Sequence, residues 1–168
     1  MVPLVGGSLI ESEVVSVHVY LYSMVDGTSA GWTGILYRIL EHEADIGFEV
    51  YGKDEADLFA NAATVLFSLI TDLDRVETRL KREVAVADSE VLLVVFLNEL
   101  LYMWDVERFI PKRLSVRVKN GRLHADLEGE ILDPERHPVR KEIKAVTYHK
   151  FAVQEEEGAL KARVYLDI

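Results

Sequence analysis

The stretch LSVRVKNGRLHADL, residues 114–127, contains two runs of alternating apolar and polar residues separated by Asn120-Gly121. A two-residue turn of type I′ needs positive φ at both central positions, and Asn-Gly is a pair that adopts this conformation readily. The stretch therefore predicts an antiparallel hairpin in which each strand has one face on the core and one face in water.

A segment with helical spacing lies upstream of this hairpin. Asp54 is a suitable N-cap, and acidic residues follow it in the first turn, where the helix dipole favours them. The apolar residues then recur every three or four positions, which predicts a helix over residues 55–70. We expect its apolar stripe to face a sheet.

A second helix is predicted over residues 90–106, with Asp88-Ser89 as its cap. Residues 91–97 are apolar on every side, which indicates a deeply buried helix. Asn98 and Glu99 interrupt the apolar run, and we expect both to lie at the solvent edge of the helix.

The remaining strands follow from short apolar or alternating runs bounded by polar breaks. They are predicted over residues 36–42, 46–52, 75–87, 145–154 and 160–166. Together these segments predict an α+β fold, a two-layer sandwich in which two helices pack on a largely antiparallel mixed sheet.

The chain has 168 residues, about the length of one domain. We assign residues 36–168 to this domain and residues 1–35 to an N-terminal extension of unknown role. Within the extension, residues 15–21 alternate apolar and polar side chains, which predicts an appended strand.

The composition limits the possible partners and compartments. The net charge is −10, from 19 basic and 29 acidic side chains, so we expect no strong direct binding to nucleic acid. An acidic chain favours a protein partner, a cation or a basic surface. There are no cysteines, which excludes disulfides and thiolate metal sites. No apolar run is long enough for a membrane span and no signal peptide is visible, so we expect a soluble cytoplasmic protein.

Common catalytic motifs are missing from the sequence. It has no glycine-rich phosphate loop and no nucleophile elbow, and its five histidines never fall at i, i+4. Two carboxylate-rich features remain. One is His42-Glu43-Ala44-Asp45, which is followed by Gly47. The other is the chain end, Asp167-Ile168, where a side-chain carboxylate lies beside the α-carboxylate. Carboxylates on ordered backbone can bind a hard cation such as calcium or magnesium.

Several blocks resemble the archease family. Residues 42–47, HEADIG, are similar to the family's His-Thr-Ala-Asp-Ile-Gly, with Glu43 in the place of the usual threonine. Further similar blocks follow in family order at residues 67–72, 97–102, 132–137, 143–149 and 166–168. The resemblance spans about 130 residues.

The resemblance implies a function as an activator rather than an enzyme. Archease promotes guanylylation and multiple turnover of an RtcB-type ligase in tRNA splicing and RNA repair. The family implies a metal site formed by Asp45, Asp167 and the α-carboxylate of Ile168, and a contribution of Lys144 to activation. For the divalent ion we expect calcium first, with magnesium or manganese as alternatives. His42 is a candidate to donate a hydrogen bond to Asp45 without binding the metal itself.

Two other functions are compatible with the same residues. A general chaperone or adaptor would need no metal but would expose a broad apolar surface. A metal-dependent hydrolase would need an open metal position and a separate general base, and no candidate base stands out in the sequence.

Overall fold

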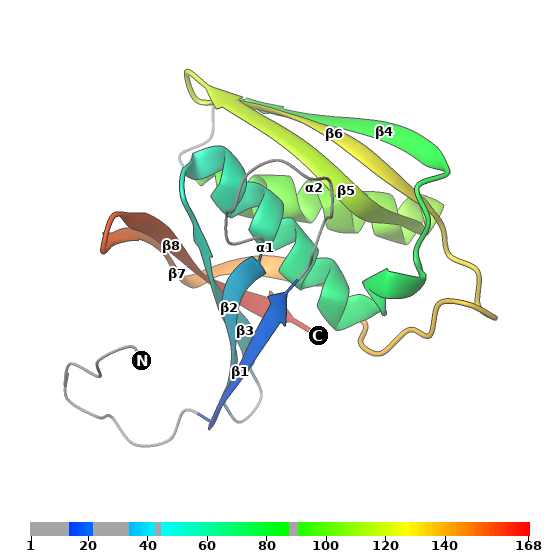
Figure 1. Cartoon of the computed structure of the whole chain (residues 1–168), viewed down its shortest axis with the longest axis horizontal. Coiled ribbons are helices and arrows are strands. Elements are labelled where there is room, and N and C mark those ends of the chain that lie inside the picture. The colour runs from blue at the N-terminus through cyan, green and yellow to red at the C-terminus, as the bar shows by residue number, and fades with distance from the viewer. Residues whose placement is uncertain (1–13, 22–33, 43–44, 88–90) are drawn as a thin grey trace.

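The computed structural model describes residues 14–21, 34–42, 45–87 and 91–168. Its strands form two antiparallel sheets with two helices between them (Figure 1). Sheet A has the strand order β1-β2-β3-β8-β7, and sheet B has the order β4-β6-β5. The elements are β1 Val14–Leu21, β2 Gly34–His42, β3 Asp45–Gly52, α1 Glu55–Ile70, β4 Leu80–Ala87, α2 Leu92–Glu107, β5 Phe109–Lys119, β6 Arg122–Ile131, β7 Ala145–Glu156 and β8 Ala159–Asp167.

The predicted α+β class, with two helices on antiparallel strands, is confirmed. The expected single mixed sheet is corrected to two sheets, which adds a third layer. Helix α1 contacts β3 and β8 on one side and β5 on the other, and α2 contacts both β7 and β4. Both helices therefore need apolar side chains around much of their circumference, as a central layer requires.

Helix α1 has the predicted bounds, Glu55–Ile70. Its N-cap is Asp54, whose side-chain oxygen Oδ1 accepts a hydrogen bond of 2.8 Å from the backbone N–H of Asp57. Phe59 of α1 stacks on Phe96 of α2, with ring centroids 6.3 Å apart, so the two helices share one core.

Helix α2 begins two residues later than predicted. It runs from Leu92 to Glu107 and has Val91 at the N-cap, without a capping side-chain hydrogen bond. The predicted cap, Asp88-Ser89, lies outside the described residues, as does Glu90. The helix ends at Arg108, which adopts the left-handed conformation with φ of 56°.

Two hairpin turns of the described residues have positive φ at both central positions. Asn120 and Gly121 have φ of 52° and 70°, which confirms the predicted turn between β5 and β6. Glu157 and Gly158 repeat this pattern between β7 and β8, with φ of 53° and 80°. These turns fix the register of each strand pair and so determine which side chains face the core.

The strand predicted from residue 75 begins only at Leu80. Residues Leu73–Arg75 form a 3₁₀ turn, capped by the Asp72 carboxylate, which accepts a hydrogen bond from the N–H of Asp74. This capped turn keeps Arg75 out of the strand.

A buried polar network holds the loop between β6 and β7. Glu130 is 3% exposed, and its carboxylate accepts hydrogen bonds from Arg136 Nη2 at 2.6 Å and from the backbone N–H of Glu77 at 2.7 Å. His137 Nδ1 accepts from the N–H of Asp133, so Nε2 carries the proton and faces Glu130 Oε1 at 3.0 Å. The sequence block at 132–137 is thus structural.

The N-terminal strand β1 pairs with β2 at the edge of sheet A, as the alternation in residues 15–21 predicted. The proposed boundary after residue 35 falls inside β2, so the strand of the extension and the following domain share one sheet. Among the described residues, no helix has the length and hydropathy of a membrane span.

Candidate functional site

The strands β3, β7 and β8 of sheet A each begin or finish at the same end of the sheet. Asp45 is the first residue of β3, Asp167 is the last residue of β8, and Ala145 is the first residue of β7. In the backbone pairing, Asp45 lies opposite His42 of β2, and Asp167 lies opposite Ala145. Residues 122 positions apart in the sequence are thereby brought to the same end of the sheet.

The ladder between β3 and β8 ends one residue before Asp45 and Asp167. Ile46 pairs with Leu166, and the two aspartates are the next residue on each strand. Ile46 and Leu166 are buried on the core side, so the alternation of strands directs the exposed aspartates to the outer face. The two aspartates thus follow the last pair of the ladder on neighbouring strands, where side chains of one face are near each other.

Lys144 contacts both final residues of the chain. Its backbone N–H donates a 2.8 Å hydrogen bond to the carbonyl of Asp167. Its ammonium Nζ lies 3.4 Å from an α-carboxylate oxygen of Ile168. The neighbours Ile143 and Val146 are 3% and 2% exposed, so they anchor the segment in the core while Lys144 remains exposed.

The charges of this edge fit a divalent cation. The three predicted ligands, Asp45, Asp167 and the α-carboxylate of Ile168, belong to this end of sheet A, and the Lys144 ammonium offsets one of their negative charges. Two negative charges remain, and their repulsion is relieved by an ion of charge +2. An all-oxygen donor set suits calcium, magnesium or manganese rather than a metal that prefers nitrogen or sulfur.

Gly47 and Tyr165 shape the outer face beside the aspartates. A Cβ atom on Gly47 would lie 2.6 Å from the carbonyl oxygen of Val164 and 2.9 Å from Cδ1 of Tyr165, so only glycine allows this ring to lie on the strand. His149 meets the same ring edge-on, and Lys150 Nζ is 5.5 Å from its centroid. Tyr165 and Lys150 were not predicted from the sequence, although Gly47 inside a strand is a signal of close approach.

The predicted position of Asn98 was wrong. It was expected at the solvent edge of α2, but it is half-buried and joins the helix to β7. Its Nδ2 donates to the carbonyl of Val146 at 2.9 Å, and its Oδ1 accepts from the N–H of Val146 at 2.9 Å. The amide thus pairs with the outer edge of β7 as a further strand would. An amide inside an apolar helical run was the available signal, because such a group must be hydrogen-bonded. Glu99 is exposed, as predicted.

Replacing Asn98 by leucine is expected to destabilise the fold by about 2 kcal/mol, because the N–H and C=O of Val146 lose their partner. The measurement is urea denaturation, together with hydrogen exchange of the Val146 amide, which should become faster. Glu99→Gln is the matched control, since an exposed neighbour should change stability by less than about 0.5 kcal/mol. Unchanged protection of Val146 in Asn98→Leu would contradict this role.

The remaining predicted residue, His42, is the backbone partner of Asp45 at the end of β2. This position is compatible with the expected support of Asp45, which stays a prediction. Glu43-Ala44 lie outside the described residues.

A second group of possible metal ligands lies on the outer face of sheet B. Glu83, His124 and Asp126 place one ligand atom each within 4.8 Å of one another. Arg117 already occupies this group, because its Nη2 lies 2.8 Å from His124 Nδ1 and 3.0 Å from Asp126 Oδ2. The guanidinium pairs with Asp126 and His124 in place of a metal ion, so we interpret the group as an ion-pair network on a solvated sheet face.

Residues 37–168 match the Archease protein family (MTH1598/TM1083). The chain belongs to the archease family. The Methanosarcina mazei archease is 39% identical over 142 residues, which cover 80% of this chain and 97% of that protein. The Pyrococcus abyssi archease is 38% identical and covers 76% of this chain and 95% of that protein.

Solved structures agree with the archease assignment. The solution structure of Methanobacterium thermoautotrophicum protein 1598 has a TM-score of 0.66 at 35% identity, covering 79% of this chain and 98% of that one. The crystal structure of an archease from Thermotoga maritima, described as a possible chaperone, shares the fold, with a TM-score of 0.54 at 22% identity over 76% of this chain and 94% of that one. The names of these archease relatives do not state a reaction.

Proposed function

We propose that this archease-family protein activates an RtcB-type RNA-splicing ligase in the cytoplasm, promoting its guanylylation and its multiple turnover. The proposal is supported by the positions of four groups at one end of sheet A. They are Asp45, Asp167, Lys144 and the α-carboxylate of Ile168. The protein itself would catalyse no reaction.

In this proposal the two aspartates and the terminal carboxylate hold a divalent ion, calcium before magnesium or manganese. The bound ion would supply a positive charge that neutralises the carboxylates and orders the chain end. Lys144 is exposed beside them and is suited to contact an anionic group of the ligase or its nucleotide. The core anchors Ile143 and Val146 keep the lysine backbone in place.

The second candidate is a general chaperone, which is favoured by the description of the Thermotoga maritima relative. A chaperone that binds unfolded clients would be expected to expose a broad apolar patch. The exposed large apolar side chains among the described residues are Leu80, Tyr102, Val106, Ile131, Val139, Tyr148, Val153 and Ile168. Two pairs share an element, one on α2 and one on β7, and the others lie on separate parts of the chain. Their scatter favours the ligase activator.

A ligation assay tests the proposal. It combines the RtcB-type ligase from the same organism, RNA ending in a 2′,3′-cyclic phosphate, GTP and a divalent metal. Faster guanylylation of the ligase and repeated turnover on adding this protein would support activation. If the protein changes neither rate with any metal, but suppresses aggregation of a thermally unfolding client, the chaperone candidate replaces it.

Extending the chain by one glycine after Ile168 is expected to impair the stimulation strongly. The extension moves the α-carboxylate by about 3.3 Å, away from Lys144 Nζ and from the aspartates. The matched control is Ile168→Leu, which retains the terminal carboxylate and should stimulate the ligase like the wild type. Full stimulation by the extended chain would remove the α-carboxylate from the proposed ligands.

A further inference from the structure

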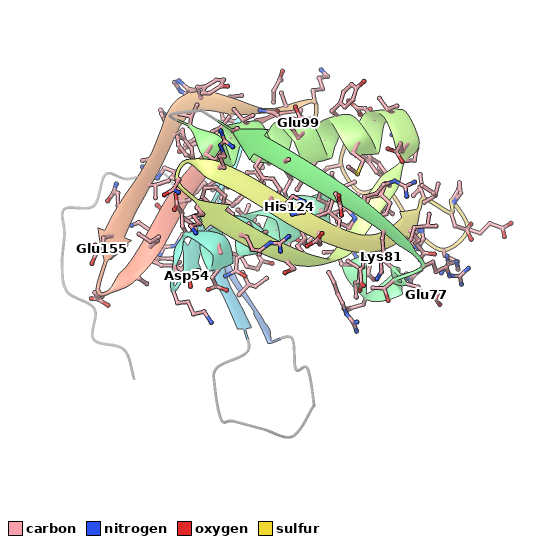
Figure 2. The ribbon with its side chains drawn as sticks, turned by 90° about the horizontal axis from the view of Figure 1, so that it is seen from above. Asp54, Glu77, Lys81, Glu99, His124 and Glu155 are labelled. Atoms are coloured by element: carbon pink, nitrogen blue, oxygen red, sulfur yellow. The ribbon has the colours of Figure 1, made fainter. Side chains whose placement is uncertain are left out.

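A groove separates α2 from the edge strand β4, away from the predicted metal ligands. Its volume is about 260 Å³. Tyr102, Met103 and Val106 of α2 form one wall, and Val84 and Ala85 of β4 form the other. Figure 2 shows β4 passing obliquely beside this helix, and the two elements are in contact.

Two exposed apolar side chains lie along the groove. Tyr102 is 65% exposed and Val106 is 63% exposed, and they lie four residues apart on the same face of α2. Neither burial nor a hydrogen bond among the described residues accounts for an aromatic ring at position 102. Exposed aromatic residues beside a cleft are typical of protein interaction sites.

Acidic side chains surround these apolar residues. Glu83 of β4 and Glu99 and Glu107 of α2 line the groove. Arg82 neutralises Glu107 at 2.8 Å. Among the described residues, Glu83 and Glu99 have no ion pair with lysine or arginine, and the ring of His124 lies 3.9 Å from Glu83.

The end of α2 adds to this negative potential. Asp105 and Glu107 lie in the last turn, where the helix dipole is negative and cations are preferred, and that turn contains no basic residue. Acidic residues at this position oppose the local preference of the helix. Residues that oppose the charge preference of a helix end are typical of functional surfaces.

We propose that this groove docks a basic segment of a protein partner, in which lysine or arginine residues flank one large apolar side chain. The volume lies below the roughly 300–1,000 Å³ of small-molecule sites, so it suits a side-chain anchor rather than a ligand. Tyr102 and Val106 contact the anchor, while Glu83 and Glu99 pair with the flanking cations. The inference stands independently of the ligase and adds a second contact surface to the protein.

Charge also argues against two other occupants. Residues 1–13 and 22–33 of this chain contain no lysine or arginine, so neither segment complements the acidic groove. A second copy carries the same net charge of −10 and would be repelled. The occupant is therefore a different, basic protein segment.

The test uses a 14-residue amphipathic peptide of leucine and lysine with one tryptophan, titrated into the full ¹⁵N-labelled chain. We expect amide shifts confined to residues 83–85 and 99–107, and weaker binding at high salt. Tyr102→Ser and Glu99→Lys should each weaken the affinity about tenfold or more, as loss of a central anchor does.

Two matched variants serve as controls, Tyr148→Ser and Glu155→Lys, which change an exposed aromatic and an exposed acid on β7. Both should retain the wild-type affinity within about twofold. Equal losses in the control and groove variants, or shifts spread over the whole acidic surface, would overturn the proposal. A dimer in sedimentation that Tyr102→Ser dissociates would also overturn it, because the groove would then bind a second copy.

Discussion

Replacing Asp45 or Asp167 by asparagine is expected to abolish the stimulation of the ligase and to leave the fold intact. Each change removes one carboxylate from the edge where β3 and β8 end, while the shape of the side chain is retained. Both aspartates are exposed, so their loss should cost less than about 0.5 kcal/mol of stability. The measurements are ligase guanylylation and multiple-turnover ligation at saturating amounts of each variant.

Calcium binding to the same variants gives a readout that does not involve the ligase. At about 100 times its Kd, a ligand stabilises the folded state by about 2.7 kcal/mol. For a chain of this length the wild-type melting temperature should rise by about 5–10 °C. The rise should disappear in Asp45→Asn and Asp167→Asn.

The control for this experiment is Asp126→Asn, whose carboxylate pairs with Arg117 on sheet B. It should preserve the calcium-dependent rise of the melting temperature. If the rise persists in both aspartate variants at the sheet edge and disappears in Asp126→Asn, the ion binds on sheet B. The ligand assignment would then be wrong.

Replacing Glu130 by alanine is expected to destabilise the protein by about 3 kcal/mol, the lower end of the cost of breaking a buried ion pair. The carboxylate is 3% exposed and accepts from Arg136, and its loss leaves His137 Nε2 and the N–H of Glu77 without this partner. The lower end applies because Arg136 remains partly solvated. Urea denaturation measures the effect.

The matched control is Glu128→Ala, two residues earlier on the same face of β6. Its ion pairs with Lys81 and Arg113 are long, at 3.7 and 4.0 Å, and its side chain is 37% exposed. A surface pair of this kind should contribute less than about 1 kcal/mol. Similar losses of stability in Glu128→Ala and Glu130→Ala would contradict the role of the network.

The pH dependence of stability provides a second test of Glu130. Burial raises the pKa of its carboxyl, but hydrogen bonds from Arg136 and from the N–H of Glu77 outweigh burial, so the pKa lies below its usual value. The stabilisation is therefore present above the unfolded pKa and is lost as the pH falls through the folded pKa. The stability difference between wild type and Glu130→Gln should shrink on acidification; a constant difference would exclude this linkage.

Local chemistry allowed the helices and turns to be predicted from the sequence. Asp54 as N-cap gave the start of α1, and Asn120-Gly121 gave the hairpin, because capping and positive φ depend on neighbouring residues only. The start of α2 was predicted two residues early, since Val91 occupies the N-cap without a capping side chain. The family followed from blocks that keep their order along the chain, and residues 37–168 confirm it.

The candidate site could be listed from the resemblance but not assembled from the sequence. Asp45 and Asp167 meet only because the register of β3 with β8 places Ile46 opposite Leu166. Asn98 holds Val146, and hence the segment after Lys144, through contacts between residues 48 positions apart. Such long-range pairings depend on the whole fold and leave no local pattern.

The sequence by itself determined the antiparallel hairpins, the α1 helix, the acidic charge and the family. The tertiary structure decided that two sheets enclose the helices, that the chain end lies beside Asp45 and Lys144, and that α2 and β4 leave an acidic groove. The physical reason is the range of the interactions. Turns and caps form between neighbours in the chain, whereas sheet order and surface shape result from packing segments that are distant in sequence.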